Sequence, residues 1–229
     1  MTGVQTCALP ISGVVAHSFD HGRGISIRTT AKAAILAMPH FVASRVAKGI
    51  GDSKAFTYGP WVVTNISVTR PPQGKGTPLA WDNVSSASES LGYVVATHQT
   101  SSAASGPTVL TWYMPLSAMN PGKARKLMLQ RTLAEWQSIV RDDLLMLSPD
   151  LEGAITRIDV WRWGHAMIRP TPGFLFTTAP AARAIAKPPL FLAHSDLSGL
   201  SLFEEAHYRG TLAAERAMRH LGHSFESLI

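Results

Sequence analysis

Hydrophobic and polar positions along the middle of the chain predict strands that form an antiparallel sheet. Three segments are rich in Val, Thr, Tyr and Trp and are joined by loops of Ser, Gly and Pro, and another strand is predicted further along the chain. β-Branched and aromatic residues favour strands, and strands that alternate with such loops pair antiparallel. The predicted strands span residues 61–68, 91–98, 108–113 and 155–163.

A helical pattern separates the third of these strands from the fourth. Over residues 121–147, apolar side chains recur at steps of three and four. This spacing puts them on one face of a helix, and Pro121 suits a first helical turn. We therefore predict one long helix, ended by Ser148 and Pro149, in which Trp136 is a core residue. The apolar positions are Leu129, Leu133, Trp136, Val140, Leu144 and Leu147.

The chain before residue 55 predicts a hairpin, a further strand and a short helix. Short strands at 14–16 and 24–28 flank a turn at 20–22. Residues 31–39 are small and apolar and end in a proline, which is typical of a buried strand. The helix is predicted at 41–46.

The last forty residues predict a strand, a tight polar turn and a closely packed helix. The run 190–193 is apolar and the turn spans 194–199. Ser201 and Glu204 have the spacing of a capping box, so the helix is expected to begin at Ser201. Small residues on one face let a helix lie close to a sheet, and the N–H groups at its start suit an electron-rich ligand. The small face consists of Ala206, Gly210, Ala213, Ala214 and Ala217.

Composition describes a globular protein and excludes several classes. The chain has 229 residues, of which 45% are hydrophobic and 16% charged. The formal net charge is +6, but Lys and Arg are spread along the chain without interleaved aromatic residues, so no nucleic-acid partner is expected. No apolar run approaches the roughly 20 residues that a membrane span needs.

The sequence gives little support for a hydrolase triad, a phosphate-binding loop or a metal site. His194, Ser195 and Asp196 are the residue types of a hydrolase triad, but three adjacent residues cannot converge as a triad does, and the G-x-S-x-G motif is absent. Phosphate-binding G-x-x-x-x-G-K-[ST] and G-x-G-x-x-G motifs are absent too. His17, Asp20 and His21 are too few to predict a metal site, so turn roles are expected and no metal is.

The first twelve residues, MTGVQTCALPIS, match the translation of a widely used sequencing-library adapter. We expect residues 1–12 to be foreign to the natural protein and the natural N-terminus, with any targeting signal, to be missing. The only cysteine, Cys7, lies in this stretch. Thiols therefore say nothing about the redox compartment, and the compartment is left open.

The segment from Lys187 to Gly222 resembles the C-terminal FAD-binding segment of the flavin-dependent amine oxidase and phytoene desaturase-like superfamily. The family pattern is an apolar strand, an acidic residue, a turn with glycine, a glutamate eight residues after the acid, and a small-residue helix. Here Asp196, Gly199 and Glu204 stand in that order, although His194 and Ser195 replace the usual Ala-Gly.

That resemblance implies a set of FAD contacts. Asp196 would lie beside the ribityl-phosphate part of FAD, and the N–H groups near Leu202 and Phe203 would face the pyrimidine oxygen of the flavin. The plain alternative is that Asp196 is a turn former and Glu204 a helix cap.

Two further stretches resemble the same superfamily. Residues 33–39 are similar to its return strand, "A-x-x-V-I-x-A-x-P", which ends here at Pro39. By the same resemblance, a backbone group of Val14 or Val15 would meet the adenine ring. Val15 and Pro39 are therefore the FAD-binding candidates of this part.

The second stretch, RWGHAMIRPTPG, is similar to the family's "R-W-x-x-A-x-P-x-x-x-P-G" segment, which carries part of the substrate-pocket wall. Trp163 would lie near the flavin, where an aromatic face can hold a cationic or apolar substrate. His165 is the nearest group that can exchange a proton near neutral pH. Packing at a domain interface is the alternative for both. Tyr93 and His98 are further pocket candidates, although a regular strand would place them on opposite faces.

These patterns together predict a mixed α/β fold. An incomplete FAD/NAD(P)-binding Rossmann-like domain is expected from residues 13–54 and 179–229, with a substrate domain at 55–178 built of an antiparallel sheet and one long helix. The resemblance implies an FAD-dependent, amine oxidase-like oxidoreductase that transfers a hydride equivalent from an amine-type or other C–H substrate to flavin, although the fragment alone is expected to be inactive. The alternative is a non-catalytic binding or interaction module.

Overall fold

The chain forms two compact units, each of which is described by itself. A computed structural model describes residues 5–6, 13–51, 53–73, 79–95, 106–176 and 186–229. The central unit comprises Tyr58–Met167, and the terminal unit comprises Met1–Thr57 together with Ile168–Ile229.

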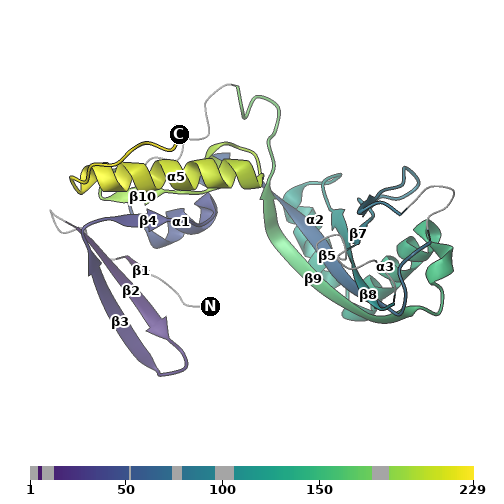
Figure 1. Cartoon of the computed structure of the whole chain (residues 1–229). Helices are drawn as coiled ribbons and strands as arrows, with labels where there is room; N and C mark the ends of the chain where they lie inside the picture. Colours follow the sequence, from purple (N-terminus) through teal and green to yellow (C-terminus); the bar gives the residue numbers. More distant parts are fainter. Residues whose placement is uncertain (1–4, 7–12, 52, 74–78, 96–105, 177–185) are drawn as a thin grey trace. The chain divides into compact units, whose positions relative to one another are not determined.

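A five-stranded sheet forms one layer of the central unit (Figure 1). Its strands lie in the order β6-β7-β8-β5-β9, and β6, β7, β8 and β5 pair antiparallel with their neighbours. The antiparallel sheet predicted from strand composition is confirmed. The strands are β5 (Tyr58–Val68), β6 (Asp82–Asn83), β7 (Tyr93–Val95), β8 (Thr108–Pro115) and β9 (Ile155–Ile168).

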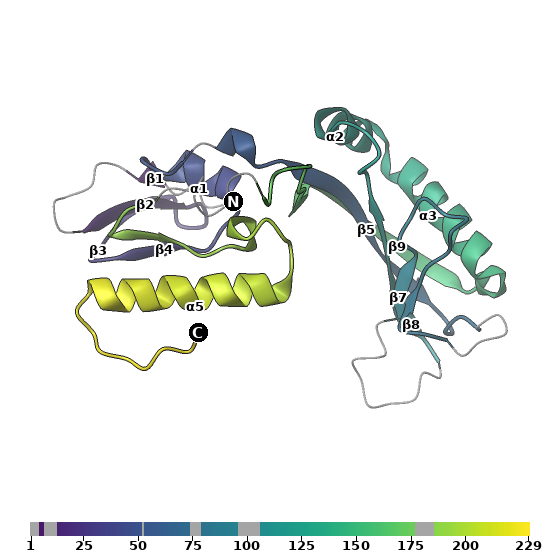
Figure 2. The ribbon, with the colours of Figure 1, turned by 90° about the horizontal axis from the view of Figure 1, so that it is seen from above.

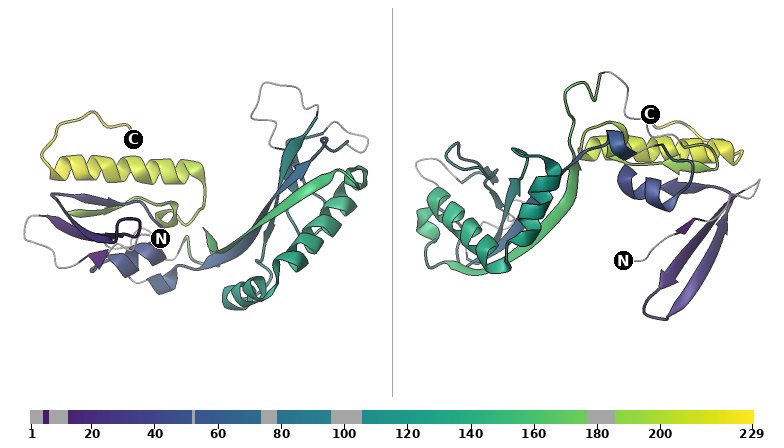
Figure 3. Two further views of the ribbon diagram at one scale, coloured as in Figure 1. Left: turned by 90° about the horizontal axis from the view of Figure 1, so that it is seen from below. Right: turned by 180° about the vertical axis from the view of Figure 1, so that it is seen from behind.

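Two helices, α2 (Pro121–Gln130) and α3 (Leu133–Leu147), cover one face of that sheet (Figure 3). The prediction of one continuous helix over 121–147 is wrong. The backbone is extended at Arg131 and Thr132, and Thr132 caps α3 through a capping box with Glu135. A capping threonine is non-helical, so it separates the two helices.

The central core lies between this helical layer and the sheet. Trp136, Val140 and Leu144 are buried there, as the helical spacing predicts, whereas Leu129 and Leu133 at the helix break are exposed. The indole Nε1 of Trp136 donates to the carbonyl oxygen of Met128 at 3.1 Å. The packing role of Trp136 is therefore confirmed.

The loop before β7 is held to α3 by the half-buried carboxylate of Asp143. Asp143 accepts hydrogen bonds from the Ser88 and Ser90 hydroxyl groups, at 2.5 and 2.6 Å, and from the indole of Trp112, at 2.6 Å. Hydrogen bonds to a charged acceptor are stronger than neutral ones, so this network fixes the loop against the core.

In the terminal unit, a pair of parallel strands lies between helices (Figure 2). Strand β4 (Ala34–Leu36) pairs with β10 (Leu190–Leu192), and α5 (Phe203–His220) runs along the pair. The apolar side chains on the other side pack with α1 (His40–Val46). The smaller elements are the 3-10 turns η1 (Ser53–Ala55) and η4 (Ser195–Leu197), and in the central unit η3 (Pro149–Leu151).

The predicted hairpin is also present. Strands β2 (Val14–Asp20) and β3 (Ile25–Ala31) pair antiparallel over their full length, and β1 (Gln5–Thr6) pairs with β2. The carboxylate of Asp20 accepts from the backbone N–H groups of Gly22 and Arg23, so its turn role is confirmed.

Helix α5 begins two residues later than the sequence predicts. Its N-cap is Leu202, and no side chain caps it. The Ser201 hydroxyl instead accepts a hydrogen bond from the backbone N–H of Ile168 at 3.1 Å. The capping box between Ser201 and Glu204 is therefore wrong, because a partner distant in sequence occupies the serine.

The small-residue face of α5 is in close contact along its second half only. Ala213 and Ala217 pack on Phe191 of β10. A methyl group added at Gly210 would meet nothing within 4 Å, and Ala206 is exposed. The predicted close approach is thus confirmed at Ala213 and Ala217. Among the described residues, no helix is long and apolar enough to cross a membrane.

Candidate functional site

The turn between β10 and α5 places a carboxylate in the interior. Asp196 lies in η4 and is only 1% exposed. Its backbone N–H donates to Nδ1 of His194 at 3.1 Å, and Nδ1 also lies 3.1 Å from Oδ1 of Asp196. Nδ1 accepts the Asp196 N–H, and the imidazole ring therefore lies against the Asp196 carboxylate.

A second segment, 156 residues away in sequence, meets the same carboxylate. The backbone N–H of His40, the first residue of α1, donates to Oδ2 of Asp196 at 2.9 Å. This bond ties the loop after β4 to the loop after β10. Pro39, the N-cap of α1, therefore lies beside Asp196, and the structure brings these two predicted FAD-binding positions together.

The His40 side chain leaves one buried nitrogen without a partner. Nε2 is 2.9 Å from the carbonyl oxygen of Gly51, an acceptor only, so Nε2 carries the proton. Nδ1 is then a bare acceptor, and no described residue donates to it. The ring is 2% exposed and packs against Phe56. A buried acceptor of this kind fits a donor from outside the described residues.

The start of α5 presents uncapped N–H groups beside this turn. Gly199 has a φ of 75°, in the left-handed region that glycine favours, and its N–H donates to the carbonyl oxygen of Asp196. Leu202 and Phe203 are 53% and 78% exposed, and Glu204 is exposed as well. Uncapped N–H groups and the positive end of the helix dipole favour an electron-rich ligand.

Val15 is the one predicted FAD-binding position outside this cluster. It lies in β2 opposite Thr30 and is buried. The structure therefore groups Pro39, Asp196, Gly199 and the first residues of α5 around one turn, while Val15 belongs to the hairpin.

The two catalytic candidates belong to the central unit. Trp163 and His165 lie two apart on β9, so both side chains point to the same face of the sheet. That face is opposite α2 and α3, because Ile158 and Val160 between the strand and the helices are core residues. Trp163 is 53% exposed, and the His165 ring lies 5.9 Å from the ring of Tyr58.

The same open face carries aromatic residues that the sequence reasoning missed. Trp161 is exposed two positions before Trp163. On the neighbouring strands, the rings of Trp61 and Tyr113 stack with centroids 6.2 Å apart. Alternation in the strands could have found these residues, since each lies one position away from a core residue. Together these side chains make an aromatic surface on the sheet.

The hydroxyl of Tyr113, on this surface, is a weaker acid than that of an ordinary tyrosine because its pKa is raised. Burial raises its pKa to about 12, and the Asp82 carboxylate adds to the rise by accepting a hydrogen bond from the Tyr113 hydroxyl at 2.9 Å and by its negative charge. Tyr113 therefore stays neutral throughout the physiological range.

The prediction of Tyr93 as a pocket residue is wrong. It is 3% exposed, and its hydroxyl lies 2.7 Å from that of Ser148 in the core, where burial raises its pKa. His98, the other pocket candidate on that predicted strand, lies outside the described residues. Nowhere in the described part of the chain do three or more His, Cys, Asp or Glu side chains group as metal ligands would.

Comparison with known proteins shows a similar fold. No protein-family model matches the sequence, and no curated protein matches it. Among solved structures, the cyclohexylamine oxidase from Brevibacterium oxydans IH-35A is similar, with a TM-score of 0.68 at 15% sequence identity. The match covers 96% of this chain and 48% of the oxidase. The chain thus resembles part of an amine oxidase fold and spans about half the length of that structure.

Proposed function

We propose that this chain is part of an FAD-dependent oxidoreductase of the amine oxidase type. The observation that carries the proposal is the fold similarity to cyclohexylamine oxidase across 96% of the chain, which includes both units. The buried Asp196 at the turn between β10 and α5 supports it, because the sequence resemblance places an FAD contact at that residue.

The terminal unit has groups that fit FAD. The carboxylate of Asp196 can accept from a ribityl or ribose hydroxyl, and the bare Nδ1 of the His40 ring, in the residue whose N–H binds that carboxylate, can accept from another donor. The uncapped N–H groups at Leu202 and Phe203 can donate to an electron-rich part of the cofactor. When bound, FAD supplies the electron acceptor for a hydride equivalent taken from the substrate.

The central unit would supply the substrate contacts. Indole rings attract cations over their faces, so Trp163 and Trp161 suit the ammonium group of an amine. His165 can accept a proton from that group near neutral pH, which would leave the neutral amine from which a hydride is transferred more readily. These residue types fit an amine better than an anionic substrate.

The match covers less than half of the oxidase, and the phosphate-binding G-x-G-x-x-G motif is absent from this sequence. We propose that the residues completing the FAD site lie in a longer protein of which this chain is a part. The 229 residues alone would then bind FAD weakly and turn over no substrate.

Reading the source DNA with long reads across the codon of Gly13 tests the proposal. We expect an upstream frame that encodes a strand, G-x-G-x-x-G, a helix and an acidic residue about 20 positions on. The recovered protein should carry a flavin whose spectrum bleaches on addition of an amine. Genuine genomic sequence and a start site at Met1–Ser12, or a flavin that no amine reduces, would favour the non-catalytic binding module instead.

A further inference from the structure

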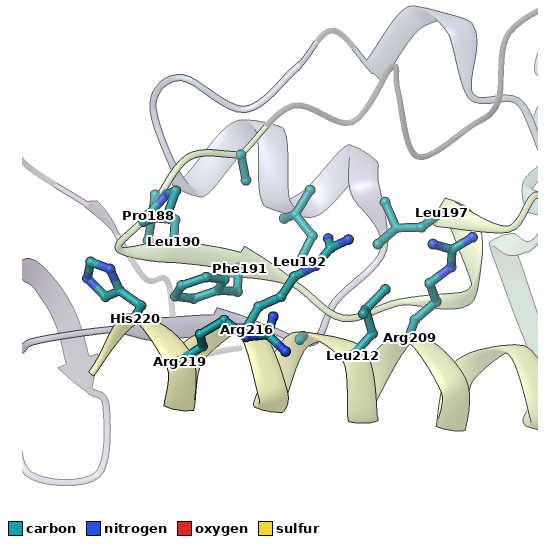
Figure 4. Close-up of a pocket in the computed structure, with 12 residues that line it drawn as sticks. Pro188, Leu190, Phe191, Leu192, Leu197, Arg209, Leu212, Arg216, Arg219 and His220 are labelled. Carbon is teal, nitrogen blue, oxygen red and sulfur yellow. The ribbon is translucent and has the colours of Figure 1, made fainter. Parts of the chain in front are cut away.

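A groove runs between β10 and α5 (Figure 4). It encloses about 450 Å³ and extends from Leu197 to Pro188 and His220. Apolar side chains line it from both sides, including Phe191 of β10 and Leu212 of α5. This volume lies within the range of roughly 300–1,000 Å³ that small-molecule sites occupy.

Three arginines of α5 line this groove: Arg209, Arg216 and Arg219. No carboxylate of a described residue lies within 4.0 Å of any of them. Glu215, next to Arg216 in the sequence, accepts hydrogen bonds from Ser227 and Leu228 of the C-terminal tail instead. The positive charge of the groove is therefore not compensated by an ion pair.

Few interactions within the described part of the chain involve the guanidinium groups of these three arginines. Nε of Arg209 donates to the Ser198 hydroxyl at 2.8 Å, and the Arg219 guanidinium lies over the Phe225 ring. A helix C-terminus favours basic residues in its last turn, which accounts for Arg219 but not for Arg209 or Arg216. Arg216 and Arg219 are one turn apart, and like charges at that spacing repel. Their position at an apolar groove points to an anion.

We propose that this groove binds a small amphipathic anion, namely a carboxylate on a hydrocarbon chain such as a medium-chain fatty acid. The hydrocarbon would lie on Phe191 and Leu212, and the carboxylate would accept hydrogen bonds from Arg216 and Arg219. Strand addition by a peptide is less suited, because β10 has only 3 residues. The proposed flavin and amine contacts use none of these side chains, so the proposal does not rest on the proposed function.

Titration of the 229-residue protein with sodium octanoate, followed by calorimetry and NMR, tests the site. We expect saturable one-to-one binding with a Kd on the order of 0.1 mM. Octanol and octyltrimethylammonium should bind at least about tenfold more weakly, since neither can accept from two guanidinium groups. Arg216→Gln/Arg219→Gln should weaken octanoate binding by at least about tenfold.

Arg28→Gln is the matched control. Arg28 is an exposed arginine of β3 in the same unit and does not line the groove, so its substitution should leave octanoate binding unchanged. Circular dichroism of each variant shows whether the fold is kept. Equal binding of octanol and octanoate, equal affinity in the double variant and the wild type, or binding only to phosphatidylglycerol vesicles would each overturn the proposal.

Discussion

Trp163 and His165 occupy neighbouring outward positions of β9, where side chains of the open face do not contribute to the core. Large aromatic side chains exposed on a sheet lose hydrophobic stabilisation that burial would provide. Three tryptophans of this face, Trp61, Trp161 and Trp163, are outside the core of the central unit. Under the proposed function, their contact is with substrate, and substitution should change catalysis more than folding.

If the proposed function is right, Trp163→Ala in the proposed longer flavoprotein should lower kcat/KM for an amine. A cation–π contact contributes about 0.5–2 kcal/mol, so the expected loss is about 2- to 30-fold. Flavin content should stay unchanged, and Trp163→Phe should keep part of the activity. Steady-state kinetics and flavin absorbance measure both. Trp81→Ala, which removes an exposed tryptophan outside this face, is the control, and an equal loss there would contradict the role of Trp163.

The titration of Tyr113 tests the environment of this face of the sheet at alkaline pH. Its pKa is raised to about 12 from an ordinary value of 10.0, chiefly by burial. Between these values folded Tyr113 keeps a proton that the unfolded chain has lost, so the contribution to stability is complete below pH 10 and falls as the pH rises through 12.

Alkaline titration of tyrosinate absorbance measures that pKa. The difference between wild type and Tyr113→Phe should show one tyrosine titrating near pH 12. Asp82→Asn removes the nearby negative charge, so this step should move to lower pH. A step that stays in place would show that Asp82 does not influence Tyr113.

At the level of elements, helix termini depend on which residue caps them. Thr132 and Glu135 cap α3 reciprocally: the threonine hydroxyl accepts from the Glu135 N–H, and the glutamate accepts from the Thr132 N–H at 2.6 Å. At α5, Ser201 is bound by Ile168 and the helix lacks a side-chain cap. The same sequence signature thus forms a capping box at one helix and not at the other.

Thr132→Ala should lower the free energy of unfolding of the central unit by about 1 kcal/mol, because it removes an N-cap. Urea denaturation followed by circular dichroism measures the change. Gln130→Ala, at an exposed position just before the break, should have an effect within about 0.5 kcal/mol. Equal effects of the two substitutions would show that the Thr132 cap adds nothing to stability.

The contribution of the Glu135 carboxylate to the stability of this cap decreases at low pH. Hydrogen bonds from the backbone and side chain of Thr132 lower the pKa of Glu135 below its ordinary value of 4.5. The contribution of its charge to stability is therefore present above pH 4.5 and is lost as the pH falls through the lowered pKa. Glu135→Gln should weaken the pH dependence of the urea midpoint in this acid range, and an unchanged profile would contradict the role of the charge.

At the level of the whole molecule, the resemblance to an amine oxidase fold extends over both units but over only 48% of the oxidase. The parallel pair β4–β10 has just two strands among the described residues. On the small-residue face of α5, Ala206 is exposed, and a methyl group added at Gly210 would meet no described atom within 4 Å. We expect this chain to present surfaces that the longer protein would bury.

The 229-residue chain should therefore bind FAD weakly. Fluorescence titration of FAD with the chain should show no saturation below roughly 10 µM, and added amine should not bleach the flavin. In the longer protein, Asp196→Ala should reduce flavin content, because the carboxylate is lost and His40 loses its partner. Tight FAD binding by this chain alone would disprove the expectation of an incomplete site.

Features with a local cause could be predicted from the sequence. The alternation along β5 and the stripe through Trp136, Val140 and Leu144 predict their own burial, because a side chain's face is set by strand or helix geometry. Most strands, the hairpin and the closing helix follow from the same local patterns. The order of Asp196, Gly199 and Glu204 indicated the candidate site through a family resemblance.

Tertiary structure decided the features that need a distant partner. Ser201 does not cap α5 because Ile168 occupies it, and Tyr93 is a core residue because Ser148 lies within hydrogen-bond distance. Asp196 meets the N–H of His40 because the pairing of β4 with β10 places the loops that follow these strands side by side. Local patterns determine which elements form, since backbone geometry acts over a few residues. Which polar groups meet depends on chain segments that folding alone brings together.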